Sequence, residues 1–466
     1  MADTTASLAP RHLDELRRCC GEVITPSDAT YDDARRLWNA IHDRQPALIV
    51  RPTTAEKVAT AVRFAREHDL EIVVRSGGHS AAGFKGADGC FLIDMSGMRG
   101  VEVDAGSRIA RSNGGALLGE LDVAAQEHGL VCPIGVVGHT GVAGLTLGGG
   151  VGRLQRHFGL TIDNLAAVEL VTANGRLVRA SETEEPDLFW GLRGAGWNFG
   201  IATAFEFRLH PFGPDLHRGF LAFPATQIQD VWTVFREYVR SAPDAVSLIF
   251  GIDRAGEGMG YPDDLVGKPI TYLAWNHSGR AEDVERDTAG LRVGPMPVAT
   301  TIGSQPYLDV QTAHDLAFAW GSRSFIKSHN ANDLRREALD ELVELVATAP
   351  GAGTFSVTAL GGTIGRVPED ATAFTGRAAQ FDLSTDANWT DPALDEAMSG
   401  WCRRALAVTE PDWTLGAYPN GNSDAGPDET RRLYGDAKLA RLAALKRVWD
   451  PDNVFHVNPN VAPAPE

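Results

Sequence analysis

Glycine is unevenly distributed along this chain, and its distribution constrains the fold more than any other feature of the sequence. The 466 residues include 50 glycines, which is about 11% against an average near 7%. Much of the excess lies between Gly77 and Gly200, and segment 131–152 alone carries eight. Glycine lets a backbone approach a ligand closely, so such loops indicate a large ligand held against the main chain. Many tight turns would give the same composition.

Charge and hydropathy exclude several classes of function. Asp and Glu number 61 against 43 Lys and Arg, a net charge of −18, so neither nucleic acid nor an anionic membrane is expected as a partner. No apolar stretch is long enough to span a bilayer, and the first residues lack a signal-peptide pattern. A cytoplasmic protein is therefore expected. The five cysteines include no CxxC pair, which argues against a disulfide framework and a zinc site.

The first 210 residues alternate between predicted strands and helices. A strand at 46–50, a helix at 54–68 and a strand at 71–75 form one βαβ unit. Asn174-Gly175 is a strong hairpin signal between two further strands. Amphipathic helices are expected at 11–20 and 31–42, and Pro186 is placed to open a helix over 186–193.

A boundary is expected at Pro211 to Pro214, after which the pattern changes. Strand-like and helix-like runs then alternate in a way that indicates a second α+β domain with an antiparallel sheet. The expected strands are 218–223, 246–252, 270–276, 355–361 and 376–383. The expected helices are 226–241, 280–290, 333–348 and 392–407, with a last helix over 427–448.

Two familiar phosphate-binding patterns nearly occur, but both fail. Gly78 to Gly83 has the spacing of a nucleoside-triphosphate loop, yet Phe84 stands where lysine is required. Segment 194–200 approaches the dinucleotide fingerprint, but it has one residue too many and a helix precedes it. A nicotinamide-dependent dehydrogenase is therefore disfavoured.

His79 is the most informative single residue. It follows an apolar strand and the sequence Arg75-Ser76-Gly77-Gly78, which places it on a loop at the end of a core strand. No HxH or HxxH pattern accompanies it, so a metal role lacks support. A loop histidine with a structural hydrogen bond is the alternative.

These residues carry a family resemblance. Arg75 to His79, followed by Gly83-Phe84, resembles the covalent-flavin loop of the berberine bridge enzyme-like family, whose members have the vanillyl-alcohol oxidase fold. Four further stretches match: Thr140 to Gly150, Asp187 to Ile201, Tyr418-Pro419-Asn420 and Asp450 to Asn460.

The resemblance implies an α+β protein with a two-part FAD-binding domain of the vanillyl-alcohol oxidase (PCMH) type. Its first part would span 1–212, with a core at about 42–211, and 416–466 would complete it. The inserted substrate domain, 213–415, would be an antiparallel sheet backed by helices.

The resemblance also implies that FAD is bound covalently through His79. Further contacts with FAD are expected from Arg75, Ser76, Gly77, Gly78, Ser80, Gly83, Phe84, Gly138, His139, Thr140, Gly141, Gly144, Asn198, Gly200, Ile201, Tyr418, Asn420, Asn458 and Asn460.

Some family members attach FAD at a second point, through cysteine. Alignment on the glycine triplet at 148–150 places that position near Val137, five residues from Cys132. Cys132-Pro133 does reproduce the family's Cys-Pro pair, so a shifted loop is possible, but a single attachment is favoured. The alternative for Cys132 is a small buried apolar residue.

Tyr418 is the expected catalytic residue, because the family places a tyrosine of a Tyr-x-Asn stretch beside substrate and flavin. It would take a hydroxyl proton while hydride passes from an alcohol or hemiacetal carbon of a sugar or secondary metabolite. Reoxidation by O₂ would give H₂O₂. The alternatives are a dehydrogenase with another electron acceptor and a flavin-binding protein without turnover. The sequence does not indicate the oligomeric state.

Overall fold

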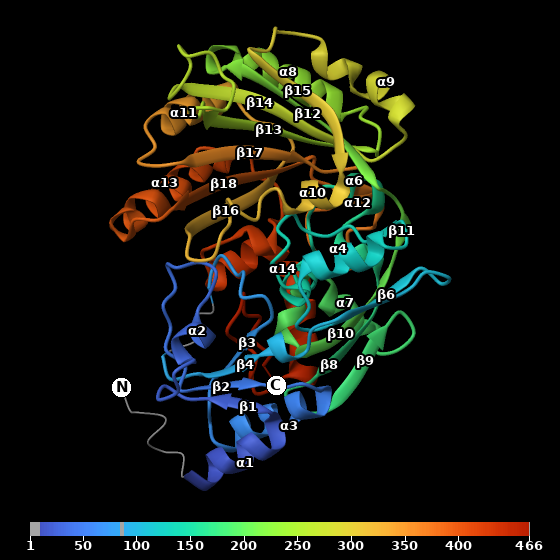
Figure 1. The fold of residues 1–466 in the computed structure, drawn as a ribbon, viewed down its shortest axis with the longest axis vertical. Helices are drawn as coiled ribbons and strands as arrows, with labels where there is room; N and C mark the ends of the chain where they lie inside the picture. The colour runs from blue at the N-terminus through green and yellow to red at the C-terminus, as the bar shows by residue number, and fades with distance from the viewer. Residues whose placement is uncertain (1–9, 84–87, 466) are drawn as a thin grey trace.

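The computed structural model describes residues 10–83 and 88–465. The chain forms a lower part, which contains both chain ends, and an upper part built around one large sheet (Figure 1). Phe84, an expected FAD contact, lies outside the described residues.

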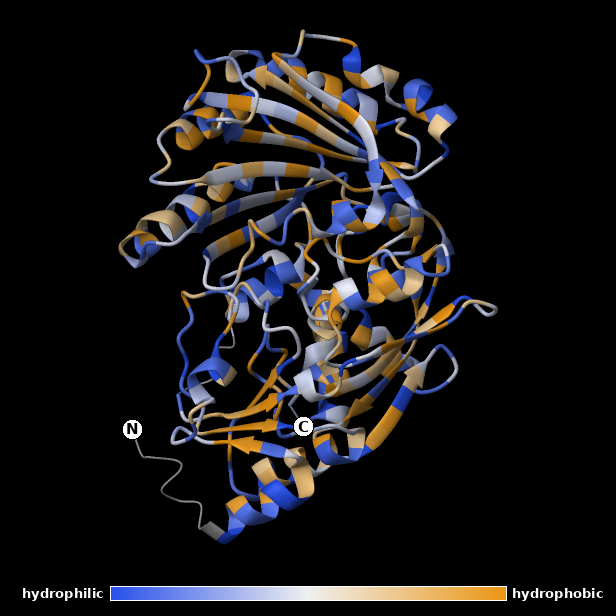
Figure 2. Cartoon of the chain, in the orientation of Figure 1, coloured by the Kyte–Doolittle hydropathy of each residue, from blue (hydrophilic) through white to orange (hydrophobic). Residues whose placement is uncertain are grey.

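The first sheet of the lower part is small and buried. Its order is β1-β2-β4-β3, and β2, β4 and β3 run parallel. The expected βαβ unit is confirmed, with α3 joining β2 to β3, but β4 lies between these two strands. Strands buried on both faces require almost wholly apolar sequences, and Figure 2 shows them as such. The bounds are β1 Glu22–Ile24, β2 Leu48–Arg51, β3 Ile72–Arg75, β4 Phe91–Asp94, α1 Pro10–Cys20 and α3 Ala55–Glu67.

The second sheet of the lower part is antiparallel, in the order β5-β6-β10-β8-β9. The hairpin expected at Asn174-Gly175 joins β8 to β9, and Gly175 has φ +73°. The glycine-rich segment after β7 contains a short helix, α5. The strands are β5 Val101–Asp104, β6 Ile109–Asn113, β7 Leu130–Val131, β8 Leu165–Val171, β9 Leu177–Ser181, β10 Ile201–Arg208 and β11 His210–Pro211. The helices are α4 Leu118–Gln126, α5 Val142–Leu147, α6 Gln155–Phe158 and α7 Pro186–Ala195.

The upper part is an antiparallel sheet of seven strands, in the order β15-β12-β14-β13-β17-β18-β16. Helices α8, α11 and α13 bury their apolar sides against one face of it. The opposite face turns toward the lower part (Figure 1). The strands are β12 Asp215–Pro224, β13 Val246–Arg254, β14 Pro269–His277, β15 Ala299–Pro306, β16 Arg323–Ala331, β17 Gly353–Ala359 and β18 Phe381–Trp389. The helices are α8 Ile228–Val239, α9 Val284–Thr288, α10 Tyr307–Thr312, α11 Arg336–Ala347, α12 Thr363–Arg366 and α13 Asp395–Ala407.

The last helix returns to the lower part. α14, Pro427–Trp449, packs against α7, and the fully buried Lys446 forms an ion pair with Asp450 at 2.7 Å. The Lys446 ammonium also donates to the carbonyls of Asn198 and Phe455. A buried ammonium needs such partners to offset its lost hydration. The C-terminal segment is thereby fixed inside the part of the molecule built by the N-terminal segments.

Two expected elements differ from the structure, and two strands were not expected. The helix expected over 31–42 ends early, as α2 Tyr31–Arg35, because Asn39 bonds to the backbone of Ala81 and Ser324 instead of continuing it. The strand expected at 376–383 is β18, shifted toward the C-terminus. Strands β15 and β16 were not expected from the sequence.

Candidate active site

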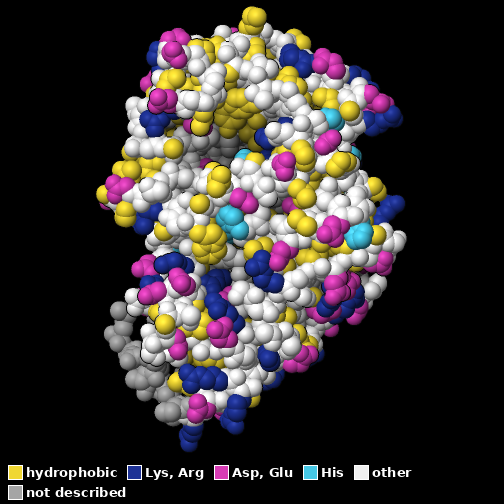
Figure 3. Space-filling model, in the orientation of Figure 1, with side chains coloured by type: hydrophobic (Ala, Val, Ile, Leu, Met, Phe, Trp, Pro, Cys, Tyr) yellow, Lys and Arg dark blue, Asp and Glu magenta, His cyan; other side chains and the backbone are white. Residues whose placement is uncertain are grey.

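A cavity of about 540 Å³ runs between the two parts of the molecule, within the size range of small-molecule sites. One end lies against the four-stranded sheet, at Ile72 and Val74, and the other against the exposed face of the seven-stranded sheet, at Ser247 and Ser356. The surface is hollowed at the level of this large sheet (Figure 3).

Two glycine loops cross in the wall of this cavity. A Cβ added to Gly77 would lie 2.2 Å from the backbone nitrogen of Gly141, and one added to Gly141 would lie 2.3 Å from that of Gly77. Only residues without side chains permit this approach. Gly144, on the next turn, differs because a Cβ there would meet no protein atom within 4 Å. Its missing side chain leaves space in the cavity, to which Gly144 contributes lining.

His79 lines the same cavity and is held on two sides. Its ring stacks on Trp38, with centroids 4.3 Å apart, and its Nε2 lies 2.7 Å from Nδ1 of His139. The indole N–H of Trp38 donates to the carbonyl of Phe318, from the upper part. Burial, together with His139, lowers the pKa of His79 to about 3. Its imidazole is therefore neutral at physiological pH.

Hydrogen bonds define which nitrogen of His79 carries a proton. His139 Nε2 lies 3.4 Å from the carbonyl oxygen of Asp315, which can only accept. When His139 is neutral its Nδ1 is the acceptor for Nε2–H of His79. The lone pair of His79 is then at Nδ1, the nitrogen that His139 leaves unoccupied.

Tyr418 lines the cavity and accepts two hydrogen bonds at its phenol oxygen. Val151 donates its backbone N–H at 3.2 Å, and Asn420 donates its Nδ2 at 3.1 Å. Burial nevertheless raises the pKa of Tyr418 above its usual value. Both donors stabilise a phenolate, but at neutral pH the resting phenol keeps its proton.

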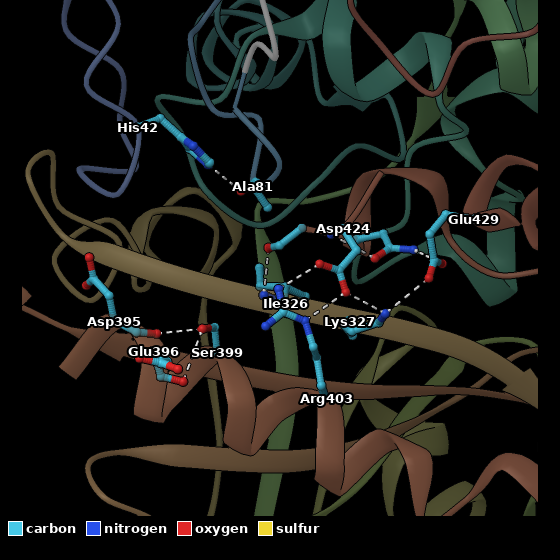
Figure 4. Close-up of polar contacts among 12 residues, drawn as sticks. His42, Ala81, Ile326, Lys327, Asp395, Glu396, Ser399, Arg403, Asp424 and Glu429 are labelled. Carbon is cyan, nitrogen blue, oxygen red and sulfur yellow. Dashed lines mark hydrogen bonds and ion pairs between the residues drawn. The ribbon is translucent and has the colours of Figure 1, made fainter. Parts of the chain in front are cut away.

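The loop that carries Tyr418 is fixed along the outer edge of β16. Ser423 exchanges hydrogen bonds with the backbone of Ile326, its N–H donating to the carbonyl and its hydroxyl accepting from the amide. Farther along, Lys327 from β16 and Arg403 from α13 both reach Asp424, as Figure 4 shows. Burial alone would raise the pKa of Asp424, but Arg403 and Lys327 hold it at about 2. These contacts join the Tyr418 loop to the upper part.

Strand β18 contributes two carboxyl groups that sequence reasoning missed. Asp382 and Asp386 line the cavity from this strand, and burial raises the pKa of each to about 7. Ser328 hydrogen bonds to Asp382, whose Oδ1 is buried without a partner among the described residues. The charge of Asp382 also contributes to raising the pKa of Tyr418. An acidic residue within a strand pattern gives little signal, because it is usually on a solvated face.

Most of the sequence-predicted site residues meet at the cavity. Those that line it are Ser76, Gly77, Gly78, His79, Ser80, Gly83, Thr140, Gly141, Gly144, Gly200, Ile201, Tyr418, Asn420 and Asn458. Five others do not: Arg75, Gly138, His139, Asn198 and Asn460.

These five residues support the walls of the cavity. Arg75 is buried in an ion pair with Asp94 at 2.6 Å. Gly138 donates its N–H to Asp315, and His139 contacts His79. Asn198 accepts a hydrogen bond from the backbone of Val461, next to Asn460.

Cys132 lies in the hydrophobic core of the lower part and does not line the cavity. Burial raises the pKa of its thiol well above the usual value, which disfavours the thiolate.

Over residues 10–83 and 88–465, no group of three metal-ligating side chains comes together. Within the same ranges, no helix combines the length and hydropathy that crossing a bilayer demands.

Comparison with known proteins now assigns the class: the protein is an FAD-linked oxidoreductase with the vanillyl-alcohol oxidase fold. Family models agree: one described as an FAD binding domain matches residues 46–181, and "Berberine and berberine like" matches 406–462. The chain is 31% identical to (R)-6-hydroxynicotine oxidase of Paenarthrobacter nicotinovorans, covering 95% of this chain and 97% of that protein. The chain belongs to the berberine bridge enzyme-like family of FAD-linked oxidoreductases.

Solved structures show the same fold. BBE-like 1 of Physcomitrella patens has a TM-score of 0.87 at 25% identity, covering 98% of this chain and 99% of that one. The xylooligosaccharide oxidase from Myceliophthora thermophila C1, solved with xylobiose, has a TM-score of 0.85 at 24% identity, with 98% and 100% coverage.

The residues of the cavity fit FAD. The crossed glycines bring bare backbone to the cavity wall, as a bound diphosphate requires. Trp197 Nε1 and Asn458 Oδ1 are buried without partners among the described residues, and both residues line the cavity. A donor and an acceptor left in this way are suited to a polar cofactor, because buried polar groups are normally paired.

Proposed function

We propose that the protein oxidises an alcohol or hemiacetal carbon of a small polar substrate and that O₂ accepts the electrons. The polar face of the seven-stranded sheet supports this most directly, since its hydroxyl and amide groups match a substrate rich in hydrogen-bonding groups. The side chains on this face are Ser247, Asn276, Ser328, Ser356, Thr358 and Ser384. Among the related proteins, one is named (R)-6-hydroxynicotine oxidase and one a xylooligosaccharide oxidase.

Bound FAD supplies the hydride acceptor, and the protein positions the substrate and moves the proton. Tyr418 is the proposed acceptor of the substrate hydroxyl proton at its phenol oxygen, where Val151 and Asn420 stabilise the negative charge. A protonated phenol must first lose its own proton. The proposed acceptor of that proton is the Asp382 carboxylate, whose charge reaches Tyr418 and which is partly ionised at neutral pH with a pKa near 7. The transfer neutralises Asp382 and so removes the charge that opposes phenolate formation.

The dependence of kcat/KM on pH tests this assignment. If the Asp382 carboxylate is required, kcat/KM rises with pH through about 7 and then stays level. Asp382→Asn removes this rise, and Tyr418→Phe lowers kcat by about 10²- to 10⁴-fold while FAD stays bound. Asp340→Asn on the exposed side of α11 is the matched control. Full activity of Tyr418→Phe would refute Tyr418 as the acceptor.

We further propose that FAD is attached through Nδ1 of His79 alone. A neutral imidazole with its lone pair at Nδ1 is a nucleophile, and the contacts with Trp38 and His139 hold the ring in place. The burial of Cys132 away from the cavity supports a single link.

Acid precipitation followed by intact mass measurement tests the link. Wild type and Cys132→Ala are expected to retain yellow colour and the mass of one FAD on the chain, and His79→Ala is expected to release both. A colourless wild-type precipitate would refute covalent attachment. Loss of the flavin from Cys132→Ala would show that the cysteine takes part.

Anaerobic reduction by substrate followed by air then separates an oxidase from a dehydrogenase, and no reduction by any substrate would indicate a binding protein.

A further inference from the structure

Arg153 is a partly buried cation whose hydrogen-bonding capacity is largely unused. It follows the glycine-rich segment and lines the cavity. One Nη donates to the carbonyl of Val310 at 3.2 Å, whereas Nε is buried without a partner among the described residues. Within those residues Arg153 forms no ion pair, although the chain carries many, such as that of Arg75 with Asp94. An unpaired buried charge is costly unless a ligand completes it.

A second arginine, Arg218, lies beside a residue that lines the cavity. Arg218 on β12 is directly opposite Asn276 on β14, which lines the cavity, so the two side chains share one face of the sheet. Its guanidinium donates to Gln305 at 3.1 Å and makes no ion pair within the described part of the chain. Burial lowers the pKa of Arg153 to about 10, and the positive charge of Arg218 adds to this effect. The positive charges of Arg153 and Arg218 therefore lie close enough to repel each other.

A histidine from a third segment, His314, lies near this pair. Burial, with the charges of Arg153 and Arg218, lowers the pKa of His314 to about 4. Two nearby acids have other partners. Asp122 accepts from Tyr307 and Gln311 and is so deeply buried that its pKa rises to about 7, and Asp315 accepts from the backbone N–H of Gly138. The excess of positive potential is thus local, within a chain of net charge −18.

We propose that Arg153 and Arg218 bind a carboxylate group of the substrate. A guanidinium fork pairs with a carboxylate through two parallel hydrogen bonds, which is the chemistry that Arg153 has left unused. Val151, two residues before Arg153, donates its N–H to Tyr418, so the anionic group would be held near the reacting carbon. This inference rests on the proposed function and narrows its substrate class to acids that carry an oxidisable alcohol, such as hydroxy acids or acidic sugars.

Benzoate and its neutral analogue benzamide are suitable probes, added to the FAD-loaded enzyme at constant ionic strength while flavin absorbance is recorded. Benzoate is expected to perturb the spectrum saturably and benzamide only weakly. Arg153→Gln and Arg218→Gln are each expected to weaken benzoate binding about tenfold or more, since charge-assisted pairs are the stronger hydrogen bonds. Arg431→Gln, which removes an exposed arginine paired with Asp436, is the matched control and should leave binding unchanged.

Equal binding of benzoate and benzamide, or unchanged benzoate binding in both arginine variants, would overturn the proposal. If Arg153→Gln does not fold, Arg218→Gln decides the outcome, because Arg218 is less buried and bonds only Gln305. The proposed anion site and the proposed oxidase function can be refuted independently of each other. Turnover of neutral sugars without benzoate binding would support the oxidase function and refute the anion site. Arginine-dependent benzoate binding without any turnover would support the anion site and refute the oxidase function.

Discussion

Gly141 and Gly144 allow the cofactor cavity to be tested, because alanine at the two positions should have opposite effects. Alanine at Gly141 should lower the stability of the protein, whereas alanine at Gly144 should leave stability intact and weaken flavin binding. In Gly141→Ala, the new Cβ would lie 2.3 Å from the backbone nitrogen of Gly77 and 2.5 Å from Oγ of Ser76. Ordinary carbon contacts begin near 3.4 Å, so two backbone segments would have to separate by about 1 Å. Overpacking of this kind costs about 1–3 kcal/mol. We expect Gly141→Ala to unfold at lower urea concentration with or without FAD.

Gly144→Ala should behave differently. The new methyl group meets no protein atom within 4 Å, and Gly144 lies within helix α5. Replacing a helical glycine by alanine stabilises a helix by up to about 1 kcal/mol. The apoprotein should therefore be as stable as wild type or more stable. The methyl group projects into the cavity, so the FAD content should fall.

Both variants are best compared in a His79→Ala background, where flavin can be removed. Urea unfolding of the apoprotein gives the free energy of unfolding, and a flavin titration followed by fluorescence gives the affinity. If Gly144→Ala bound FAD as tightly as its parent, the cofactor would not approach α5 and the reasoning from this cavity would be wrong. If Gly141→Ala were fully stable, the crossing of the two loops would be wrong.

Two further outcomes follow from the ion pairs. The pKa of Asp424 is about 2 against a usual 3.8, and (3.8 − 2) × 1.36 gives about 2 kcal/mol. This stability is present above pH 4 and lost as pH falls toward 2. Asp424→Asn should therefore lower the free energy of unfolding at pH 7 and reduce its fall between pH 4 and pH 2, as measured by urea titrations. An unchanged fall in that pH range would contradict this. Asp94→Asn should cost about 3–5 kcal/mol because it leaves Arg75 buried and unpaired, and a urea midpoint equal to wild type would show that the pair is not required.

The sequence predicted the fold best where local pattern and burial agree. The βαβ unit and the Asn174-Gly175 hairpin were found because apolar runs and turn residues mark them. β15 was missed because nearly all of its residues are exposed at a sheet edge, without apolar alternation. β18 was placed too early because Gly376 and Arg377, at the start of the expected strand, donate their backbone N–H groups to Glu369 instead of pairing in the sheet.

The site was predicted where family motifs mark it. His79 and Tyr418 stand within distinctive sequences, and both line the cavity. Asp382 and Arg153 carry no such signal, since their roles depend on which face of a strand or loop meets the cavity. Only tertiary structure shows that Asp382 is buried and that Arg153 forms no ion pair within the described part of the chain.

The burial of Lys446 among Asn198, Phe455 and Asp450 has a consequence for the order in which this protein is made. Residues near both ends of the chain complete one cavity, and the whole seven-stranded sheet is synthesised between them. During translation the upper sheet can form while the lower part still lacks α14 and Asn458. The cavity can close only after the segment from Lys446 to Asn458 has been synthesised, since this wall must pack back against strands made hundreds of residues earlier. A nascent chain that has not yet reached this segment therefore lacks one wall of the cavity, so completion of the cavity comes late in synthesis.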